Sequence, residues 1–281
     1  MSDRRRAARH VTLLVGAGRM GGALLKVWAA RGLGSVAVIE PAPDPQIRSL
    51  ARRSDNIRFL NRIEDAAGLD IAACVIALKP QVLRVEAWRL KPVAASGALM
   101  LSIAAGTSIA ALRRAWGRQV LIMRAMPNMP GAIGRGITAL YAPPAVSAAL
   151  RARAEALVAG FGETIWVGRE GLIDAVTAIS GSGPAYVFLL AECLARAARA
   201  QGFSAEIADR LARATVSGAG ALLDADPRKP AALRQDVTSP GGTTEAALGV
   251  LMKDDVLGKL MTEAAAAARA RAMELGRQSE L

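Results

Sequence analysis

A glycine-rich turn near the start of the chain limits the possible fold more than any other feature. The apolar run Val11–Val15 leads directly into Gly16-Ala17-Gly18-Arg19-Met20-Gly21, and a helical pattern over Met20–Ala30 follows. In such a strand–turn–helix, Gly16 permits the tight turn, Gly18 lets backbone N–H groups approach a pyrophosphate, and Gly21 lets the helix pack close to the strand. The helix N-terminus adds partial positive charge. The turn therefore predicts a dinucleotide site, with an ordinary structural turn as the alternative.

Short apolar runs recur through the first half of the chain, with helical stretches between them. The continuous apolar run Ala72–Leu78 is typical of a strand buried on both faces. Strands that alternate with helices predict a doubly wound, mostly parallel sheet of the α/β class. The expected strands are Val11–Val15, Val36–Glu40, Ile57–Leu60, Ala72–Leu78, Leu99–Ile103, Leu121–Arg124, Ile137–Tyr141 and an edge strand Thr164–Val167, with a helix at Ser108–Trp116.

After Gly168 the strand signals stop and Ala-rich helical periodicity takes over. We therefore expect an α/β Rossmann domain over residues 1–168 and an all-α helical domain over residues 169–281. Ser204 is expected to open one helix, and Gly202 and Gly276 to close others. Ala-rich helices offer little core volume, which favours interlocking with a second copy of the chain. The expected helices are Leu172–Ser180, Pro184–Gln201, Ala205–Leu223, Pro230–Val237, Gly242–Leu251 and Val256–Leu275.

Glu40 ends the second predicted strand, where a Rossmann domain meets the adenosine ribose. An acid at this position accepts hydrogen bonds from the ribose hydroxyls and repels a 2′-phosphate, which favours NADH over NADPH. Arg48, Arg52 and Arg53 follow closely and could neutralise a phosphate. A solvated acid at a strand end is the alternative. The sequence thus predicts NADPH or NADH as cofactor and leaves the choice open.

The loops after other predicted strands are candidates for the same site, because ligands of open α/β sheets bind beyond the carboxyl ends of the strands. In Ala77-Leu78-Lys79-Pro80, Lys79 is placed to touch a phosphate or the substrate. In Ser102-Ile103-Ala104-Ala105-Gly106, the small residues Ala104, Ala105 and Gly106 would let a nicotinamide lie flat against the backbone. Ala125-Met126-Pro127-Asn128 follows a third strand. Each segment taken alone also fits an ordinary turn.

Two segments of the helical half stand out from its Ala-rich background. They are Ser180-Gly181-Ser182-Gly183-Pro184 and Thr238-Ser239-Pro240-Gly241-Gly242-Thr243-Thr244. Both are expected to be turns that open a helix, and so to present N–H groups and hydroxyls to a carboxylate. Capped connections between helices are the alternative. Together the two turns predict a cradle for an anionic substrate.

The net charge of +12 raises the question of a nucleic-acid partner. The only dense run of basic residues is Arg4, Arg5, Arg6 and Arg9. No aromatic residues lie between them to stack on bases. The other basic residues are spread along the chain. We therefore expect a solvated basic tail and no nucleic-acid partner.

Metal sites and membrane spans are also not expected. The single histidine, His10, precedes the first strand, and Cys74 and Cys193 lack metal-like spacing, so both thiols are expected to be buried. The apolar stretch Ala185–Ala191 is far shorter than the roughly 20 residues that span a bilayer. These features predict a soluble, unprocessed, cytoplasmic protein with no metal and no membrane contact.

In this order along the chain, from Val11 to Gly276, these motifs resemble the pyrroline-5-carboxylate reductases. The most distinctive are DAVTAISGSGPAY at 174–186 and DVTSPGGTTEAAL at 236–248. The resemblance implies a Rossmann domain followed by a helical substrate-binding and dimerisation domain, assembled as a homodimer or a ring of dimers. It also implies NAD(P)H-dependent reduction of 1-pyrroline-5-carboxylate to L-proline, the last step of proline biosynthesis.

The resemblance also implies roles for individual residues. Ser239, Pro240, Gly241, Gly242, Thr243 and Thr244 would bind the substrate, with the backbone N–H groups and Ser239 holding its carboxylate. Thr244 would contact the ring nitrogen, and Glu170 would lie near it. Asn61 would touch the cofactor, and Lys79 joins Thr244, Ser239 and Glu170 among the candidate catalytic residues.

The expected chemistry needs few special groups. A protonated imine is already electrophilic and the product amine keeps its proton, so catalysis is mainly positioning and requires neither a nucleophile nor a metal. A β-hydroxyacid-type dehydrogenase would need a lysine on the helix Pro184–Gln201, and that helix has none. A dinucleotide-binding sensor without turnover is the alternative from another class.

Overall fold

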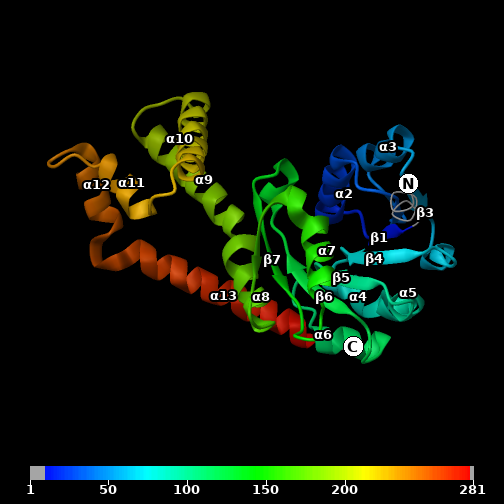
Figure 1. The fold of residues 1–281 in the computed structure, drawn as a ribbon. Coiled ribbons are helices and arrows are strands. Elements are labelled where there is room, and N and C mark those ends of the chain that lie inside the picture. The colour runs from blue at the N-terminus through cyan, green and yellow to red at the C-terminus, as the bar shows by residue number, and fades with distance from the viewer. Residues whose placement is uncertain (1–9, 279–281) are drawn as a thin grey trace. The chain divides into compact units, whose positions relative to one another are not determined.

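The structure is a computed structural model that describes residues 10–278 (Figure 1). Arg4, Arg5, Arg6 and Arg9 lie outside the described residues. The chain forms two compact units. The first runs to Gly181 and resumes at Ala268, and the second is Ser182–Ala267.

The first unit is built on one sheet of eight strands in the order β3-β2-β1-β4-β5-β6-β7-β8. All neighbouring strands are parallel except β6 and β7. Those two are antiparallel because their connection is too short for a parallel crossover. The predicted doubly wound, mostly parallel sheet is confirmed. The strands are β1 (Val11–Val15), β2 (Val36–Ile39), β3 (Ile57–Leu60), β4 (Ile71–Ile76), β5 (Leu99–Ser102), β6 (Ile122–Met126), β7 (Gly136–Tyr141) and β8 (Gly162–Trp166).

Helices cover both faces of this sheet (Figure 1), and an apolar cluster lies under each layer. Leu14 of β1 packs into one cluster and Leu13 and Val15 into the other, as strand alternation requires. The helices of this unit are α2 (Arg19–Arg31), α3 (Pro45–Arg53), α4 (Pro80–Glu86), α5 (Lys91–Ala95), α6 (Ile109–Trp116), α7 (Ala148–Val158) and α8 (Gly171–Val176).

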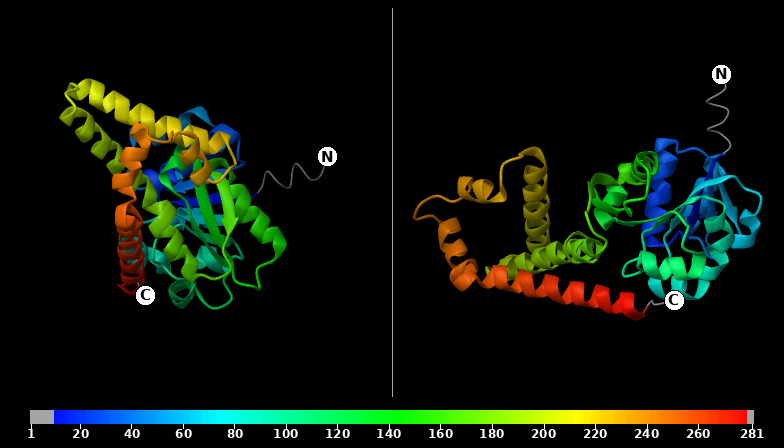
Figure 2. Two further views of the ribbon diagram at one scale, coloured as in Figure 1. Left: turned by 90° about the vertical axis from the view of Figure 1, so that its left-hand side faces the viewer. Right: turned by 60° about the horizontal axis from the view of Figure 1, so that its bottom comes forward.

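The second unit is entirely helical, and α9 and α10 pack side by side within it (Figure 2). As predicted, the Ser204 side chain caps α10 by accepting a hydrogen bond from the Ile207 N–H (3.4 Å). Gly202, with φ +95°, follows the end of α9 as predicted. The helices are α9 (Gly183–Ala200), α10 (Ala205–Ala225), α11 (Pro230–Asp236), α12 (Thr243–Leu251) and α13 (Val256–Gln278), the last of which continues into the first unit.

The predicted turn Ser180–Pro184 is wrong, because the chain stays helical through it. A π-helical turn, Thr177–Gly181, joins α8 to α9 with only Ser182 between them. The Ser180 carbonyl accepts a hydrogen bond from Asn128 Nδ2 (3.1 Å), and the Ser180 hydroxyl bonds back to the Val176 carbonyl (3.3 Å). These contacts outweigh the turn preference of glycine and serine. The segment therefore offers no open helix start to a carboxylate.

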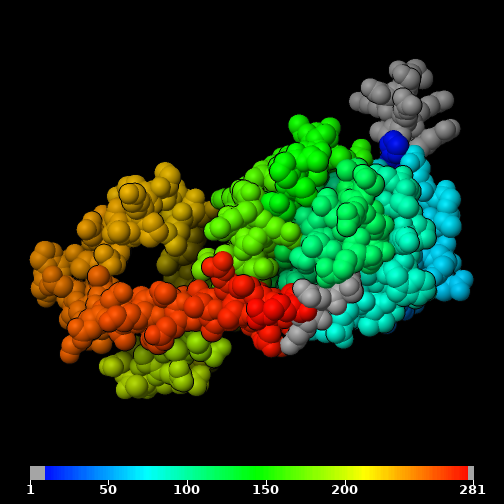
Figure 3. Space-filling view, turned by 90° about the horizontal axis from the view of Figure 1, so that it is seen from below, coloured from blue at the N-terminus to red at the C-terminus, as the bar shows by residue number. Residues whose placement is uncertain are grey.

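The sequence predicted that Gly276 ends the last helix. This prediction is wrong, because Gly276 lies inside α13. A Cβ at Gly276 would come within 2.6 Å of the Gly106 carbonyl oxygen, and a Cβ at Gly106 within 2.9 Å of the Ala272 carbonyl oxygen. Figure 3 shows the red end of α13, which belongs to the first unit, packed beside other residues of that unit. Both glycines therefore allow a close backbone approach between α13 and the loop after β5.

The two cysteines differ in burial. Cys74 in β4 is buried, as predicted, and burial raises the pKa of its thiol. Cys193 in α9 is exposed, so the prediction of a buried thiol is wrong for this residue. The reason is that α9 leaves much of its surface uncovered within the second unit.

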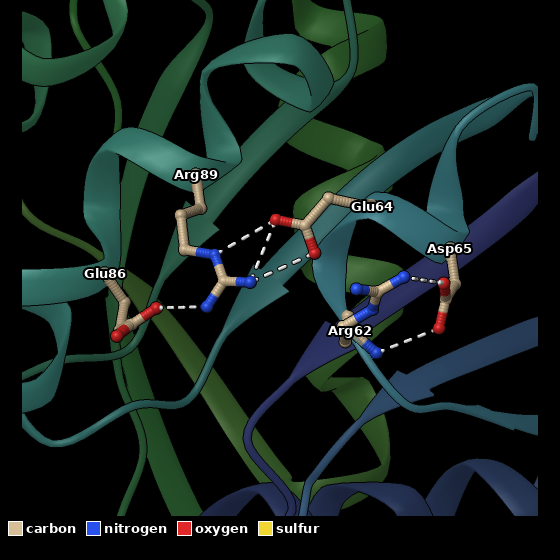
Figure 4. Close-up of polar contacts among 5 residues, drawn as sticks. All are labelled: Arg62, Glu64, Asp65, Glu86 and Arg89. Carbon is tan, nitrogen blue, oxygen red and sulfur yellow. Dashed lines mark hydrogen bonds and ion pairs between the residues drawn. The ribbon is translucent and has the colours of Figure 1, made fainter.

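A group of charged side chains ties the β3–β4 connection to the helices on one face (Figure 4). Arg89 donates from Nη2 to both carboxylate oxygens of Glu64 (2.9 and 3.0 Å) and from Nη1 to Glu86 (2.9 Å). The backbone N–H of Arg62 bonds the Asp65 carboxylate (3.0 Å). All these side chains are at least partly solvent-exposed, so the group acts at the surface of the fold.

Candidate active site

The carboxyl ends of four strands lie side by side at one edge of the sheet. The Gly16 N–H bonds the Ile39 carbonyl (2.8 Å), the Ala77 N–H bonds the Val15 carbonyl (2.8 Å), and the Ile103 N–H bonds the Ile76 carbonyl (3.0 Å). The strand order reverses between β1 and β4 at this edge. Open α/β sheets bind their ligands at such a reversal, so the predicted cofactor segments are gathered where a cofactor is expected.

Each glycine of the turn has the surroundings that its predicted role requires. Gly16 has φ +91°, and a Cβ there would lie 2.8 Å from the Ala77 carbonyl oxygen. A Cβ at Gly21 would overlap the Gly16 carbonyl oxygen, which shows how closely α2 packs on β1. Gly18 is exposed, with nothing within 4 Å of its Cβ position. The space above Gly18 and the N-terminus of α2 therefore fits a pyrophosphate.

The Glu40 carboxylate binds two backbone donors beside this turn. Its Oε2 accepts from the Ala17 N–H (2.8 Å), and its Oε1 accepts from the Ala42 N–H (3.2 Å). Both oxygens are therefore fixed at the carboxyl end of β2, next to the glycine turn.

The other predicted cofactor residues lie around the same edge with different exposure. Lys79 is exposed directly before α4, and Asn61 is exposed after β3. Ala105 is half-buried and Ala104 is buried. Gly106 is buried against the backbone of α13, so its own small size already serves a packing contact.

Glu170 is held inside the first unit by partners that the sequence did not reveal. Its Oε1 accepts from the Ile109 N–H at the start of α6 (2.7 Å) and from Arg124 Nη1 (3.3 Å). Arg124 is 2 % exposed and also bonds Asp174 (3.4 Å), while its buried Nε has no partner among residues 10–278. An arginine inside an apolar strand was the available sequence signal for this cluster.

Asn128, the last residue of the predicted strand-end segment Ala125–Asn128, has partners that the sequence did not show. It is 8 % exposed, donates to the Ser180 carbonyl, and accepts from the Ile137 N–H (3.0 Å). It therefore joins the end of β6 to the π-helical turn and to β7.

The predicted substrate loop, residues 238–244, leads into α12 in the second unit. The Gly241 N–H binds Glu245 Oε2 (2.7 Å), and the Gly242 N–H binds the Ser239 carbonyl (3.0 Å). Two of the expected N–H donors are thus already used within the loop. In the described chain no acceptor contacts the N–H groups of Thr243 and Thr244, which form the first turn of α12.

The single histidine lies away from the predicted cofactor site. His10 pairs with Asp70 (2.8 Å) at the amino ends of β1 and β4, the opposite edge of the sheet from the glycine turn. Among residues 10–278, no three histidine, cysteine or acidic side chains are grouped as a metal site would need.

The family model for pyrroline-5-carboxylate reductase dimerisation matches residues 170–275. The chain is 35% identical to the pyrroline-5-carboxylate reductase of Pseudomonas aeruginosa, over 94% of this chain and 96% of that protein. It is equally similar, at 35%, to the Synechocystis enzyme of the same name, over 94% of this chain and 98% of that protein.

Solved structures agree with the relatives. A pyrroline-5-carboxylate reductase from Coxiella burnetii superposes with a TM-score of 0.84 at 31% identity, covering 94% of this chain and 97% of that one. The Plasmodium falciparum pyrroline carboxylate reductase, solved with NADP bound, has a TM-score of 0.80 at 25% identity, with coverage of 94% and 97%. With the glycine turn and the 238–244 loop both present in the fold, the chain belongs to the pyrroline-5-carboxylate reductase family.

Proposed function

We propose that this protein reduces 1-pyrroline-5-carboxylate to L-proline with NADPH or NADH. The observation that carries the proposal is the presence, in one chain, of an intact dinucleotide turn and of the 238–244 loop within the region matched by the dimerisation model. We retain residues 1–168 and 169–281 as the functional domains, with a cytoplasmic location.

The start of α12 supplies the donors for the substrate carboxylate. The free N–H groups of Thr243 and Thr244 lie at the positive end of that helix, and the Ser239 hydroxyl lies on the exposed part of the loop. Glu245, bonded to Gly241, keeps the loop in the shape that exposes them. In this proposal the Thr244 side chain bonds the ring nitrogen.

A bound nicotinamide would supply the hydride, and the residues of the chain supply the positioning. Gly16, Gly18 and Gly21 hold the pyrophosphate at the N-terminus of α2, while Ala104 and Ala105 leave room at the end of β5. The imine carbon is electrophilic once its nitrogen is protonated, and the amine product keeps that proton. Correct placement of the two reacting carbons therefore accounts for most of the rate.

Glu170 is a positioning residue in this proposal. Its carboxylate is already bound to Arg124 and to the start of α6, so it orders the end of the sheet. Asn61 and Lys79 are exposed and remain available to the cofactor, and Lys79 to the substrate as well.

A homodimer explains the surface of the second unit. The side chains of Phe188, Leu190 and Leu260 are 64%, 53% and 57% exposed, whereas its buried residues are chiefly alanines. The consecutive apolar residues Val187–Leu190 of α9 are all exposed, and contiguous exposed apolar surface marks a protein interface. The helical run Gly171–Ala200 would also pass as a membrane span by length and composition alone, but we assign its apolar face to a second copy.

The test is proline formation from 1-pyrroline-5-carboxylate, followed with NADH and NADPH in parallel. Thr244→Ala should lower kcat/KM by at least about tenfold, the effect of losing one hydrogen bond in the reacting complex. The matched variant Thr262→Ala, an exposed threonine on α13, should be unchanged. The proposal would be refuted if folded protein that still binds dinucleotide formed no proline with NADH and none with NADPH.

A further inference from the structure

We propose that this enzyme prefers NADH to NADPH and that Glu40 sets the preference. The inference specifies the cofactor of the proposed reductase and rests on that proposal for its kinetic readout. It starts from the position of Glu40, which directly follows β2 at the carboxyl edge of the sheet beside the glycine turn. This is where a Rossmann domain meets the adenosine ribose.

The two backbone hydrogen bonds of Glu40 suit an unmodified ribose. Each carboxylate oxygen has two acceptor positions. One position on Oε2 is taken by the Ala17 N–H and one on Oε1 by the Ala42 N–H. One position remains on each oxygen, and the 2′- and 3′-hydroxyls of a ribose are two neighbouring donors. The carboxylate is thus fixed in place with the number of acceptors that the diol requires.

The loop after Glu40 offers little to a 2′-phosphate. Pro41 and Pro43 have no N–H group, and the Ala42 N–H is already bound by Glu40. Asp44 adds a second carboxylate, which caps α3 by accepting from the Gln46 N–H (2.8 Å). A phosphate placed here would lie beside Glu40, where two like charges repel each other.

The arginines of α3 do not offset the repulsion between Glu40 and a 2′-phosphate. Arg52 and Arg53 lie in the last turn of the helix. At about 1.5 Å of rise per residue, they are roughly 10 Å along the axis from the end that follows Glu40. Arg48 is nearer, but it is exposed and one turn inside the helix.

Two cations of the neighbouring elements are bound to other partners, and Arg19 at the start of α2 is exposed. Lys26 of α2 donates to Gln46 Oε1 (3.3 Å). Arg62, after the neighbouring strand β3, forms an ion pair with Asp65 (3.8 Å; Figure 4). Within residues 40–44, which connect β2 to α3, the charged groups are therefore the carboxylates of Glu40 and Asp44.

The experiment measures NAD⁺ and NADP⁺ binding by titration calorimetry without imine substrate, and then kcat/KM with NADH and NADPH. Wild-type protein should bind NAD⁺ at least about tenfold more tightly than NADP⁺, the effect of one like-charge contact near a surface. Glu40→Gln, which removes the charge but replaces one accepting oxygen with an NH2 donor, should reduce that ratio to near one. Glu40→Ser is a second variant in case the glutamine is poorly folded. Arg48→Ala is the matched control and should leave the ratio unchanged.

Two results would overturn the inference. One is a wild-type protein that binds NADP⁺ as tightly as NAD⁺ or more tightly. The other is a folded Glu40→Gln variant whose ratio equals that of the wild type. Selective NAD⁺ binding without imine reduction would instead refute the reductase activity and leave the inference in place.

Discussion

At the scale of single residues, Gly18 and Gly21 belong to one turn but meet different surroundings. Gly18 faces open space, whereas a Cβ at Gly21 would overlap the Gly16 carbonyl oxygen. Substitution by alanine should therefore affect dinucleotide binding at Gly18 and the stability of the fold at Gly21.

Gly18→Ala should leave the free energy of unfolding almost unchanged and weaken dinucleotide binding, because its methyl group enters only the space of the pyrophosphate. Gly21→Ala should lower the free energy of unfolding by about 1–3 kcal/mol, because α2 must move away from β1. Urea unfolding and calorimetric titration on both variants test this. A Gly18→Ala protein that binds dinucleotide normally would contradict the assignment of the turn.

Arg124 supplies a second residue-scale prediction, since its removal leaves Glu170 and Asp174 without their cation. Arg124→Met should lower the free energy of unfolding by about 3 kcal/mol, as for a broken buried ion pair. The exposed Arg118→Met variant is the control and should have little effect. Equal urea midpoints for the two variants would show that the cluster does not stabilise the fold.

The sequence predicted motifs of consecutive residues well, and it predicted contacts between residues far apart in the chain poorly. The turn Gly16–Gly21 and Glu40 were recognisable because strand, turn and helix follow one another directly. Arg124 and Glu170 are 46 residues apart, and Asn128 and Ser180 are 52 apart. A local pattern can show that Arg124 is unusual in an apolar strand, but it cannot identify a partner that only folding brings near.

At the scale of elements, predicted strands agree with the structure to within about two residues because buried parallel strands are continuous apolar runs. The helices α3, α4, α5 and α7 were not predicted, and the turn at Ser180–Pro184 was predicted where a helix continues. Glycine and serine signal a turn locally, but the side chain of Asn128 stabilises the helical alternative.

The link between the β3–β4 connection and α4 gives a pH prediction. A hydrogen bond from its own backbone N–H and the bonds from Arg89 lower the pKa of Glu64. A carboxyl whose pKa is lower in the folded state stabilises the fold above its ordinary pKa of about 4.3, and this contribution is lost as the pH falls through the lowered value.

The unfolding temperatures of wild type and Glu64→Gln should therefore differ slightly at pH 7, and the difference should shrink as the pH falls below about 4. The effect should be small because the pair is at the surface. A difference in Tm that stays constant between these pH values would mean that ionisation of Glu64 does not matter.

At the scale of the whole molecule, the Ala-rich composition predicted self-association, and the dimerisation model matches that region. The sequence did not predict that α13 continues from the second unit into the first. Two reasons explain this. Gly276 and Gly106, which come into contact when α13 returns, are far apart in the chain. In addition, a glycine at the end of a helical pattern is locally a signal for the end of the helix.

Phe188→Glu places a charge on the exposed apolar face of α9 and should shift the protein from dimer towards monomer, since burying a phenylalanine contributes about 1.5–3 kcal/mol. Trp88→Glu is the matched control, because Trp88 in the first unit is 67% exposed and Phe188 is 64% exposed. Sedimentation velocity at micromolar concentration distinguishes the two. Identical sedimentation of both variants and the wild type would exclude α9 from the interface.

The course of α13 also determines how the protein can be divided. The chain leaves the first unit after Gly181 and returns to it at Ala268, so the second unit is an insertion rather than a tail. A fragment that stops at Gly181 would lose the helix whose backbone lies against Gly106. An isolated cofactor-binding half would therefore need the last turns of α13 as well, joined by a linker in place of residues 182–267.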